Sequence, residues 1–385
     1  MRGRLLLCTY PPILLVLLIN IMKVTILPEN ITPYLPLINK ILPTHSQVPI
    51  LSNILLKATT DGFFIKATDL ELGAQVKIPA KIEREGAITV PGREFVETIN
   101  SLPKDKIAIT YDKGEATIIC RENKIKFNTI SQEEFPVLFK EKGVEVARFG
   151  KKEFTEIFSY LTFSVSQEDS RPQLTGVLID SRDDATNFVS TDGYRMSVKT
   201  IKTQSKKLKE GLIVSVDLIN EVMSLKSENE VILYVNKEES QVLIEVGDAI
   251  VIGRMIEGKF PDYERVLPSK SRTTVVFNRD ELFQNVKIAS IFARETSNIA
   301  TLEISGDSMK LVTRAQGVGE GEAVIECRKE GEDNRIAFNI RYLMDLLKAL
   351  TDQEIELGLN SQTEPAVFRT KEKDFLHVIM PIQVD

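Results

Sequence analysis

The sequence predicts an α+β protein built from three consecutive copies of one unit, each with two helices and an antiparallel sheet. One helical pattern of apolar residues occurs three times, about a third of the chain apart. Short runs that alternate between apolar and polar residues fill the segments between the helices. The chain has 385 residues and 43% hydrophobic content, which is enough for two or three domain cores.

The helices give the clearest repeat. Apolar residues with the i, i+1, i+4, i+7 spacing begin at Phe95, Leu218 and Leu343, and this spacing is typical of one face of an amphipathic helix. A preceding helix is expected in each copy, after a polar or proline-containing start, at residues 31–41, 154–161 and 282–292. Six helices in a repeated order therefore define the three units.

Between the helices, alternating runs such as 62–67 and 231–235 predict about eight short strands in each unit. A Thr-Asp turn recurs at Thr68 and Thr191, with a degenerate copy at 313–316. In the middle copy Asp192-Gly193 predicts a tight hairpin, because glycine adopts positive φ without a steric penalty.

The strand after this turn should place alternate side chains on opposite faces. Tyr194, Met196 and Val198 are expected on one face, and Arg195 and Ser197 on the other.

Each unit closes with an aromatic residue or methionine followed by proline, at 135–136, 260–261 and 380–381. The expected domains are 22–147, 148–272 and 273–385, and the second boundary falls in the polar linker 267–272. Residues 1–21 are an N-terminal extension whose apolar run is broken by Pro11, Pro12 and Asn20 and is too short to span a bilayer. We expect translation to start at Met22, and the extension not to belong to the fold.

Composition excludes several function classes. The net charge of −6 argues against a protein that simply coats nucleic acid. The cysteines, at 8, 120 and 327, lack a paired spacing, which fits a cytoplasmic protein without disulfides or a cysteine-ligated zinc. No P-loop, His-Glu-x-x-His or Gly-x-Ser-x-Gly pattern occurs, and the glycine-rich segment 317–321 indicates a turn.

We therefore expect a protein without catalytic residues, metal or cofactor. Two alternatives stay open: a metal-dependent nuclease that acts on DNA through its carboxylates, and a structural protein that never binds DNA.

Basic side chains lie in or beside the six expected helices. They are Lys40, Arg93, Lys151, Lys152, Lys287, Arg294, Arg341 and Lys348. Each one alone is best explained as part of a solvated helix face. Together, on a shared surface, they would contact phosphates without reading bases.

Residues 22–385 resemble the bacterial sliding clamps, the β subunits of DNA polymerase III. The segments that carry the resemblance are 68–71, 189–198, 257–268, 338–342 and 378–382. The resemblance implies a head-to-tail homodimer of three-domain protomers that closes into a ring around duplex DNA, with helices inside and sheets outside. It also implies an accessory subunit that tethers the polymerase, whereas nucleotidyl transfer belongs to the partner. Implied partners are the polymerase III α subunit, the clamp loader, and other polymerases and repair proteins.

The resemblance also implies three groups of site residues. A hydrophobic pocket for short partner peptides would be lined by Leu174, Thr191, Gly193, Tyr194, Arg195, Met196, Pro261, Arg265, Val266, Val378, Met380, Pro381 and Ile382. DNA would be contacted by His45, Arg93, Arg171 and Gln173. At the ring interface, Phe127 would meet Ile291 and Phe292 of the other protomer, with Glu320 and Glu322 as ion-pair partners.

Overall fold

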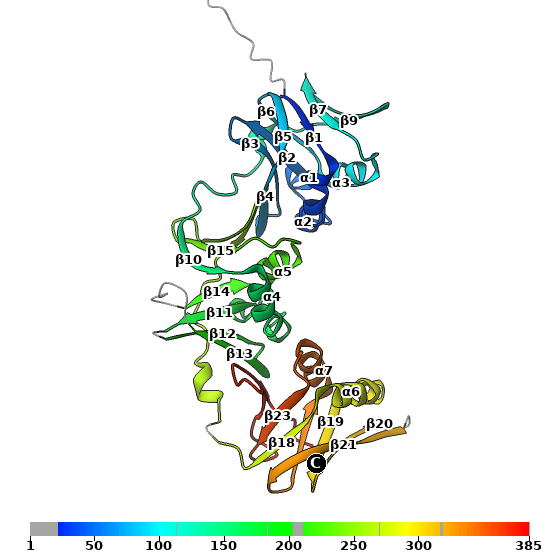
Figure 1. Cartoon of the computed structure of the whole chain (residues 1–385), viewed down its shortest axis with the longest axis vertical. Coiled ribbons are helices and arrows are strands. Elements are labelled where there is room, and N and C mark those ends of the chain that lie inside the picture. Colours follow the sequence, from blue (N-terminus) through cyan, green and yellow to red (C-terminus); the bar gives the residue numbers. More distant parts are fainter. Residues whose placement is uncertain are drawn as a thin grey trace, which may run out of the picture. The chain divides into compact units, whose positions relative to one another are not determined.

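The structure is a computed structural model that describes residues 22–112, 114–182, 184–202, 211–268, 270–315 and 319–384. The N-terminal extension and part of the segment 316–321 lie outside the described residues. The chain forms two compact units, one containing residues up to 69 and 75–136, the other 70–74 and 137–385. Figure 1 shows the elements of both units, which are described separately below.

The first unit holds the first repeat. Its strands are β1 (Met22–Ile26), β2 (Asn53–Thr59), β3 (Gly62–Thr68), β5 (Ala80–Arg84), β6 (Gly86–Pro91), β7 (Ile107–Asp112), β8 (Glu115–Cys120) and β9 (Asn123–Asn128). The strand β4 (Leu72–Ile78) begins in residues assigned to the second unit. One antiparallel sheet has the order β5-β1-β7-β8-β9, and β2 pairs with both β3 and β6.

The first expected helix of this repeat is broken. The structure has α1 (Pro28–Ile31), a 3-10 turn (Thr32–Tyr34) and α2 (Leu35–Ile41) where the sequence predicted one helix over 31–41. Pro33 and Pro36 lie at the starts of the second and third pieces. Proline lacks the N–H that a helix interior requires, so the chain restarts at each one. The second helix, α3 (Gly92–Ser101), is continuous and buries Phe95, Val96 and Ile99 as expected.

The second unit contains the middle and last repeats. The elements of the middle repeat are β10 (Val144–Phe149), α4 (Lys151–Ser159), β11 (Gly176–Ser181), β12 (Ala185–Thr191), β13 (Arg195–Lys202), β14 (Leu212–Ser215), α5 (Val216–Ser224), β15 (Val231–Asn236), β16 (Gln241–Val246) and β17 (Ala249–Arg254). Those of the last repeat are β18 (Thr273–Asn278), α6 (Arg279–Ala293), β19 (Ile299–Ser305), β20 (Ser308–Ala315), β21 (Gly319–Gly331), β22 (Asn334–Asn339), α7 (Ile340–Ala349), β23 (Glu354–Leu359), β24 (Ala366–Thr370) and β25 (Phe375–Ile379).

The six-helix repeat predicted from the sequence is confirmed in type and order. Within each repeat the two helices pack against each other, as α2 on α3, α4 on α5 and α6 on α7. Side-chain caps fix several helix starts, because an oxygen of Ser215, Asn278 or Asn339 accepts a hydrogen bond from a backbone N–H in the first turn. The domain limits stay a prediction: position 147 lies within β10, whereas position 272 directly precedes β18.

One sheet joins the middle and last repeats. Its strand order is β14-β11-β12-β13-β25-β24-β23-β18-β21-β20-β19-β22, and β13 pairs antiparallel with β25 through Met196 opposite Val378. The strand that follows the Asp-Gly turn therefore lies beside the C-terminal strand, although the two are far apart in sequence. Among the described residues, no helix is long and apolar enough to span a bilayer.

The predicted alternation along β13 is only partly right. Met196 and Val198 share one core cluster, but Tyr194 precedes the strand and is 60% exposed. Ser197 on the other face is completely buried, and Arg195 nearly so. Both faces are covered: Phe260 and Tyr263 share the core cluster of Met196 and Val198 on one face, and Ser164 and Tyr342 contact Ser197 and Arg195 on the other. Simple alternation assumes one wet face.

Candidate functional site

A cavity of about 250 Å³ opens where the start of β13, the C-terminal segment and the segment 261–266 meet. All of these parts belong to the second unit. The lining residues are Arg171, Leu174, Thr191, Gly193, Tyr194, Arg195, Met196, Pro261, Asp262, Tyr263, Val266, Val378 and Met380. We call it the first cavity.

The floor of the first cavity is apolar and belongs to the protein core. Leu174, Met196, Tyr263 and Val378 are buried members of one hydrophobic cluster. Tyr194, Val266 and Met380 stand at the rim and expose 60%, 42% and 38% of their surface. An exposed methionine beside an exposed tyrosine provides adaptable apolar surface for a ligand.

The turn before β13 is held by its own side chains. The Asp192 Oδ1 atom accepts hydrogen bonds from the backbone N–H groups of Tyr194 and Arg195, both at 2.9 Å. Gly193 adopts a φ of +94°, in the region that favours glycine. Leu70 holds the same place in the turn of the first repeat, with a φ of +80°. The hairpin is thus a shared element of the fold, and the side chains after it distinguish the middle copy.

Arg195 lines the first cavity and contacts residues of both the middle and the last repeat. Its Nε atom donates to Asp192 Oδ2 at 3.0 Å, and its Nη1 atom donates to Asp345 Oδ2 at 2.7 Å. The guanidinium carbon lies 4.5 Å from the ring centre of Tyr342, within the range of a cation–π interaction. Since Asp345 and Tyr342 are on α7, this side chain ties the middle repeat to the last.

The backbone of the C-terminal segment closes the opposite side. The Met380 N–H donates to the Tyr194 carbonyl at 2.9 Å, and the Ile382 N–H donates to the Ala337 carbonyl at 2.8 Å. The first bond brings Met380 to the rim of the cavity, whereas the second draws the following residues toward β22.

Three residues predicted for the peptide pocket are not among those that line the first cavity. Pro381 and Ile382 follow the chain toward β22, and Arg265 is 85% exposed at its side chain and pairs with Asp262 at 2.7 Å. Asp262 and Tyr263 line the cavity although the sequence analysis did not assign them to it. They are the two residues that follow Pro261 in the motif 257–268, so proximity in sequence was the available signal.

The residues predicted to contact DNA fall into two places. His45 and Arg93 are exposed in the first unit, where Arg93 Nη2 donates to the carbonyls of Leu42 and Pro43 at 3.3 Å each. Arg171 and Gln173 lie in the second unit, and Arg171 is on the wall of the first cavity. Its Nη2 atom donates to Glu168 Oε2 at 3.1 Å.

The residues predicted for the ring interface are also divided between the two units. In the last repeat, Phe292 on α6 lies beside Gly319 and Gly321 of β21, close to the exposed side chain of Ile291. Glu322 pairs with Lys310 at 2.7 Å, and Glu320 approaches Arg314 at 3.7 Å.

Two further exposed apolar residues on the same elements, Ile288 (60%) and Val324 (61%), were missed by the sequence analysis. Phe127 is on β9, an edge strand of the first unit, and is 8% exposed.

Ser197 of β13 belongs to a cluster of buried polar side chains. The Ser197 Oγ atom lies 2.7 Å from His377 Nδ1 and also accepts from Ser164 Oγ at 3.0 Å. Burial, with a smaller contribution from nearby Arg195, lowers the pKa of His377 well below its usual value. No three His, Cys, Asp or Glu side chains among the described residues converge as a metal site would require.

Comparisons with known proteins agree with this architecture. Models for the N-terminal, central and C-terminal domains of the DNA polymerase III beta subunit match residues 22–139, 149–262 and 264–383. The beta sliding clamp of Synechocystis sp. is 30% identical and covers 85% of this chain and 89% of its own length.

Solved structures agree as well. The DNA polymerase III beta subunit of Thermotoga maritima is 25% identical, with a TM-score of 0.87 over 94% of this chain and 100% of its own. The C. crescentus beta sliding clamp is 24% identical, with a TM-score of 0.88 over 95% of this chain and 100% of its own. That clamp was crystallised with PEG bound to a proposed beta-motif tethering region.

The three repeats, their paired helices and the continuous sheet define a DNA clamp. More specifically, the chain belongs to the DNA polymerase III β subunit family, the bacterial β sliding clamps. It is a processivity clamp that tethers DNA polymerase III and other clamp-binding proteins to duplex DNA, and it is a non-catalytic accessory subunit. A homodimer is the norm in this family, and nothing supports the nuclease alternative.

Proposed function

We propose that the first cavity is the docking site for short peptide segments of the polymerase and of other clamp-bound proteins. The observation that carries this proposal is the combination of a buried apolar floor with exposed Tyr194, Val266 and Met380 at the rim. Ligand pockets for whole small molecules are usually about 300–1,000 Å³. A cavity of about 250 Å³ suits a few apolar side chains of a peptide.

The polar groups around the cavity are already engaged with one another. Arg195 is held by Asp192 and Asp345, and Arg171 pairs with Glu168 nearer the solvent. Because the Arg195 side chain is only 10% exposed, its conformation is largely fixed before a ligand arrives, so it loses little conformational entropy when a peptide binds. We therefore assign Arg195 the role of shaping the cavity, and Tyr194 and Met380 that of covering the bound side chains.

We infer that the ring closes head to tail through α6 and β21 of one protomer and β9 of the other. Ile291 exposes 62% of its surface and Ile288 exposes 60%, and such apolar surface is stabilised when a partner covers it. Phe127 of the partner protomer would pack against Ile291 and Phe292, with Glu320 and Glu322 at the rim. His45, Arg93, Arg171 and Gln173 would contact phosphates without base specificity.

The protein works on DNA inside the cell, and we place it in the cytoplasm. Residues 22–147, 148–272 and 273–385 serve as its three clamp domains. A ring of such domains retains DNA by topology, so its individual phosphate contacts can stay weak.

The docking proposal is tested with a fluorescent synthetic peptide that carries the clamp-binding segment of the polymerase α subunit encoded in the same genome. Replacing the two exposed rim residues that would cover the bound peptide, Tyr194→Ala with Met380→Ala, should weaken binding by at least about 2 kcal/mol, roughly thirtyfold. Val137→Ala, a 76% exposed position away from the cavity lining, is the matched control and should bind like the unaltered protein. Unchanged affinity in the double variant, with the fold intact, contradicts the assignment.

A further inference from the structure

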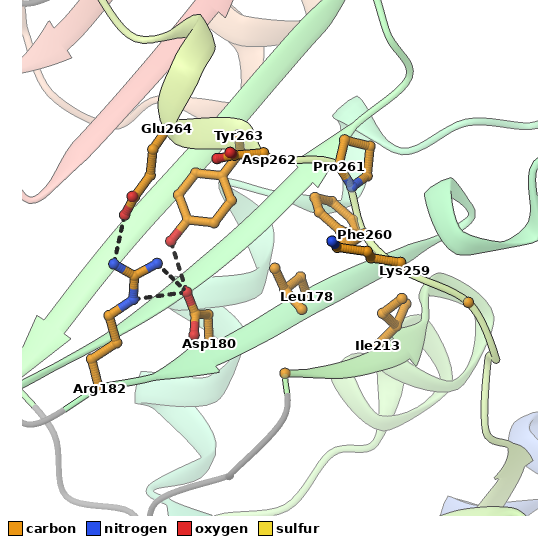
Figure 2. Close-up of a pocket in the computed structure, with 12 residues that line it drawn as sticks. Leu178, Asp180, Arg182, Ile213, Lys259, Phe260, Pro261, Asp262, Tyr263 and Glu264 are labelled. Atoms are coloured by element: carbon orange, nitrogen blue, oxygen red, sulfur yellow. Dashed lines mark hydrogen bonds and ion pairs between the residues drawn. The ribbon is translucent and has the colours of Figure 1, made fainter.

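We propose that a second cavity, next to the first, binds residues of the partner that flank its docking segment, and that it selects an acidic side chain there. This inference rests on the proposed docking function of the first cavity. The second cavity has a volume of about 590 Å³ and is lined by Leu178, Asp180, Arg182, Gly211, Ile213 and residues 258–264 (Figure 2).

The two cavities lie on either side of one short segment. Pro261, Asp262 and Tyr263 line both of them. A peptide that leaves the first cavity across Pro261 therefore enters the second without crossing another element. Because only this segment separates the two cavities, a longer peptide would gain contacts in the second without a separate association step.

The floors of the cavities also belong to one core. Leu178, Ile213 and Phe260, in the second cavity, are buried in the same cluster as Met196 and Val378 of the first. Figure 2 shows these three side chains together at one end of the second cavity. A rigid apolar floor at that point fits the aliphatic part of a flanking residue.

The other end of the second cavity is closed by paired charges. The Arg182 Nε and Nη2 atoms donate to Asp180 Oδ2 at 3.1 and 2.9 Å, and Arg182 Nη1 lies 2.7 Å from Glu264 Oε1. The Tyr263 hydroxyl donates to the same Asp180 oxygen at 2.9 Å, and burial raises the pKa of Tyr263 to about 12. Figure 2 shows these contacts as dashed lines that join Glu264, Arg182, Asp180 and Tyr263. These carboxylates already accept hydrogen bonds, so a basic ligand would have to compete with Arg182.

Lys259 is different from the other charged residues of the second cavity. It is exposed and has no ion pair or hydrogen bond among the described residues, whereas Asp180, Arg182, Asp262 and Glu264 all have partners. The unpaired ammonium group can gain an opposite charge without breaking an existing contact. The complementary ligand is thus a peptide segment with an aspartate or glutamate beside its docking residues.

The test compares synthetic peptides that share the polymerase α segment defined above and differ only in a two-residue extension. The extension is Asp-Asp, Ser-Ser or Lys-Lys, placed at the amino end or at the carboxyl end. At one of the two ends, Asp-Asp should bind about three- to fivefold more tightly than Ser-Ser at low ionic strength, as expected for one exposed ion pair. The gain should shrink as salt is added.

The decisive variant is Lys259→Glu, with Lys237→Glu as a matched control. Lys237 is also an exposed lysine of the middle repeat, and it lines neither cavity. In Lys259→Glu the preference should reverse, so that Lys-Lys binds more tightly than Asp-Asp at the same end. In Lys237→Glu it should match the unaltered protein.

Equal affinity of all extensions at both ends overturns the inference, and so does a preference that Lys259→Glu leaves unchanged. The unextended peptide tests the docking function independently of the second cavity. If it binds and responds to Tyr194→Ala with Met380→Ala, the docking function stands whatever the extensions do. If it does not bind, the docking function itself fails.

Discussion

The Arg195 Nη1 atom lies 2.7 Å from Asp345 Oδ2, which joins the first residue of β13 to α7 of the last repeat. The arginine side chain is only 10% exposed, so this contact is better protected from solvent than a typical surface ion pair. Because Arg195 lines the first cavity, residues of both repeats fix the position of this side chain. The shape of the first cavity, our proposed docking site, therefore depends on how the middle and last repeats are held together.

Removing the carboxylate in Asp345→Ala should weaken peptide binding about three- to tenfold and lower the free energy of unfolding by about 1–2 kcal/mol. Arg195 would keep Asp192 but lose a charge-assisted hydrogen bond. Peptide anisotropy and urea unfolding measure the two effects. Glu372→Ala, which removes an exposed carboxylate from the turn before β25, should change neither. Full affinity in Asp345→Ala would show that the pair does not shape the cavity.

Phe292→Asp should convert the dimer to monomer at micromolar concentration. The substitution places a charge among Ile288, Ile291 and Val324, which we assign to the ring interface. Sedimentation equilibrium measures the mass directly. Val137→Asp introduces the same charge at an exposed position outside this surface and should remain dimeric. A full dimer of Phe292→Asp would contradict the interface assignment.

His377 should make the protein less stable at acidic pH. Its pKa is lowered in the folded state, mainly by burial, so the unfolded chain binds a proton more readily. Stability is then lost as the pH falls through the unfolded value near 6.5, by up to about 1.4 kcal/mol per pH unit.

Urea unfolding at pH 7.5, 6.5 and 5.5 tests this dependence. The unaltered protein should lose more stability toward pH 5.5 than His377→Gln does, although the variant starts from a lower stability. His45→Gln, at an exposed histidine, should keep the slope of the unaltered protein. Parallel slopes for the unaltered protein and His377→Gln would rule out a role for this residue in the acid response.

The repeated elements could be predicted because their signals are local. The helix beginning near Phe95 and the turn at Gly193 each depend on a few neighbouring residues. The signal for the interruption of the first helix, Pro33 and Pro36, was equally local, but the prediction of one continuous helix did not take it into account.

Contacts between distant segments had no such signal. The pairing of β13 with β25, and the bond from Arg195 to Asp345 across 150 positions, depend on tertiary packing. Arg171 was placed with DNA by resemblance, and that contact stays a prediction; the sequence did not indicate that the residue also lines the first cavity. An arginine can pair with a carboxylate or with a phosphate, so the residue type alone did not predict that Arg171 pairs with Glu168.

Retention on DNA tests the central claim of a closed clamp most directly. The protein is loaded by its clamp loader onto a nicked circular plasmid, isolated by gel filtration, and measured again after one restriction cut. A topological clamp should stay with the circle and leave within minutes of linearisation, whereas Phe292→Asp should not be retained. Equal retention on circular and linear DNA, or none on the circle, would contradict the account.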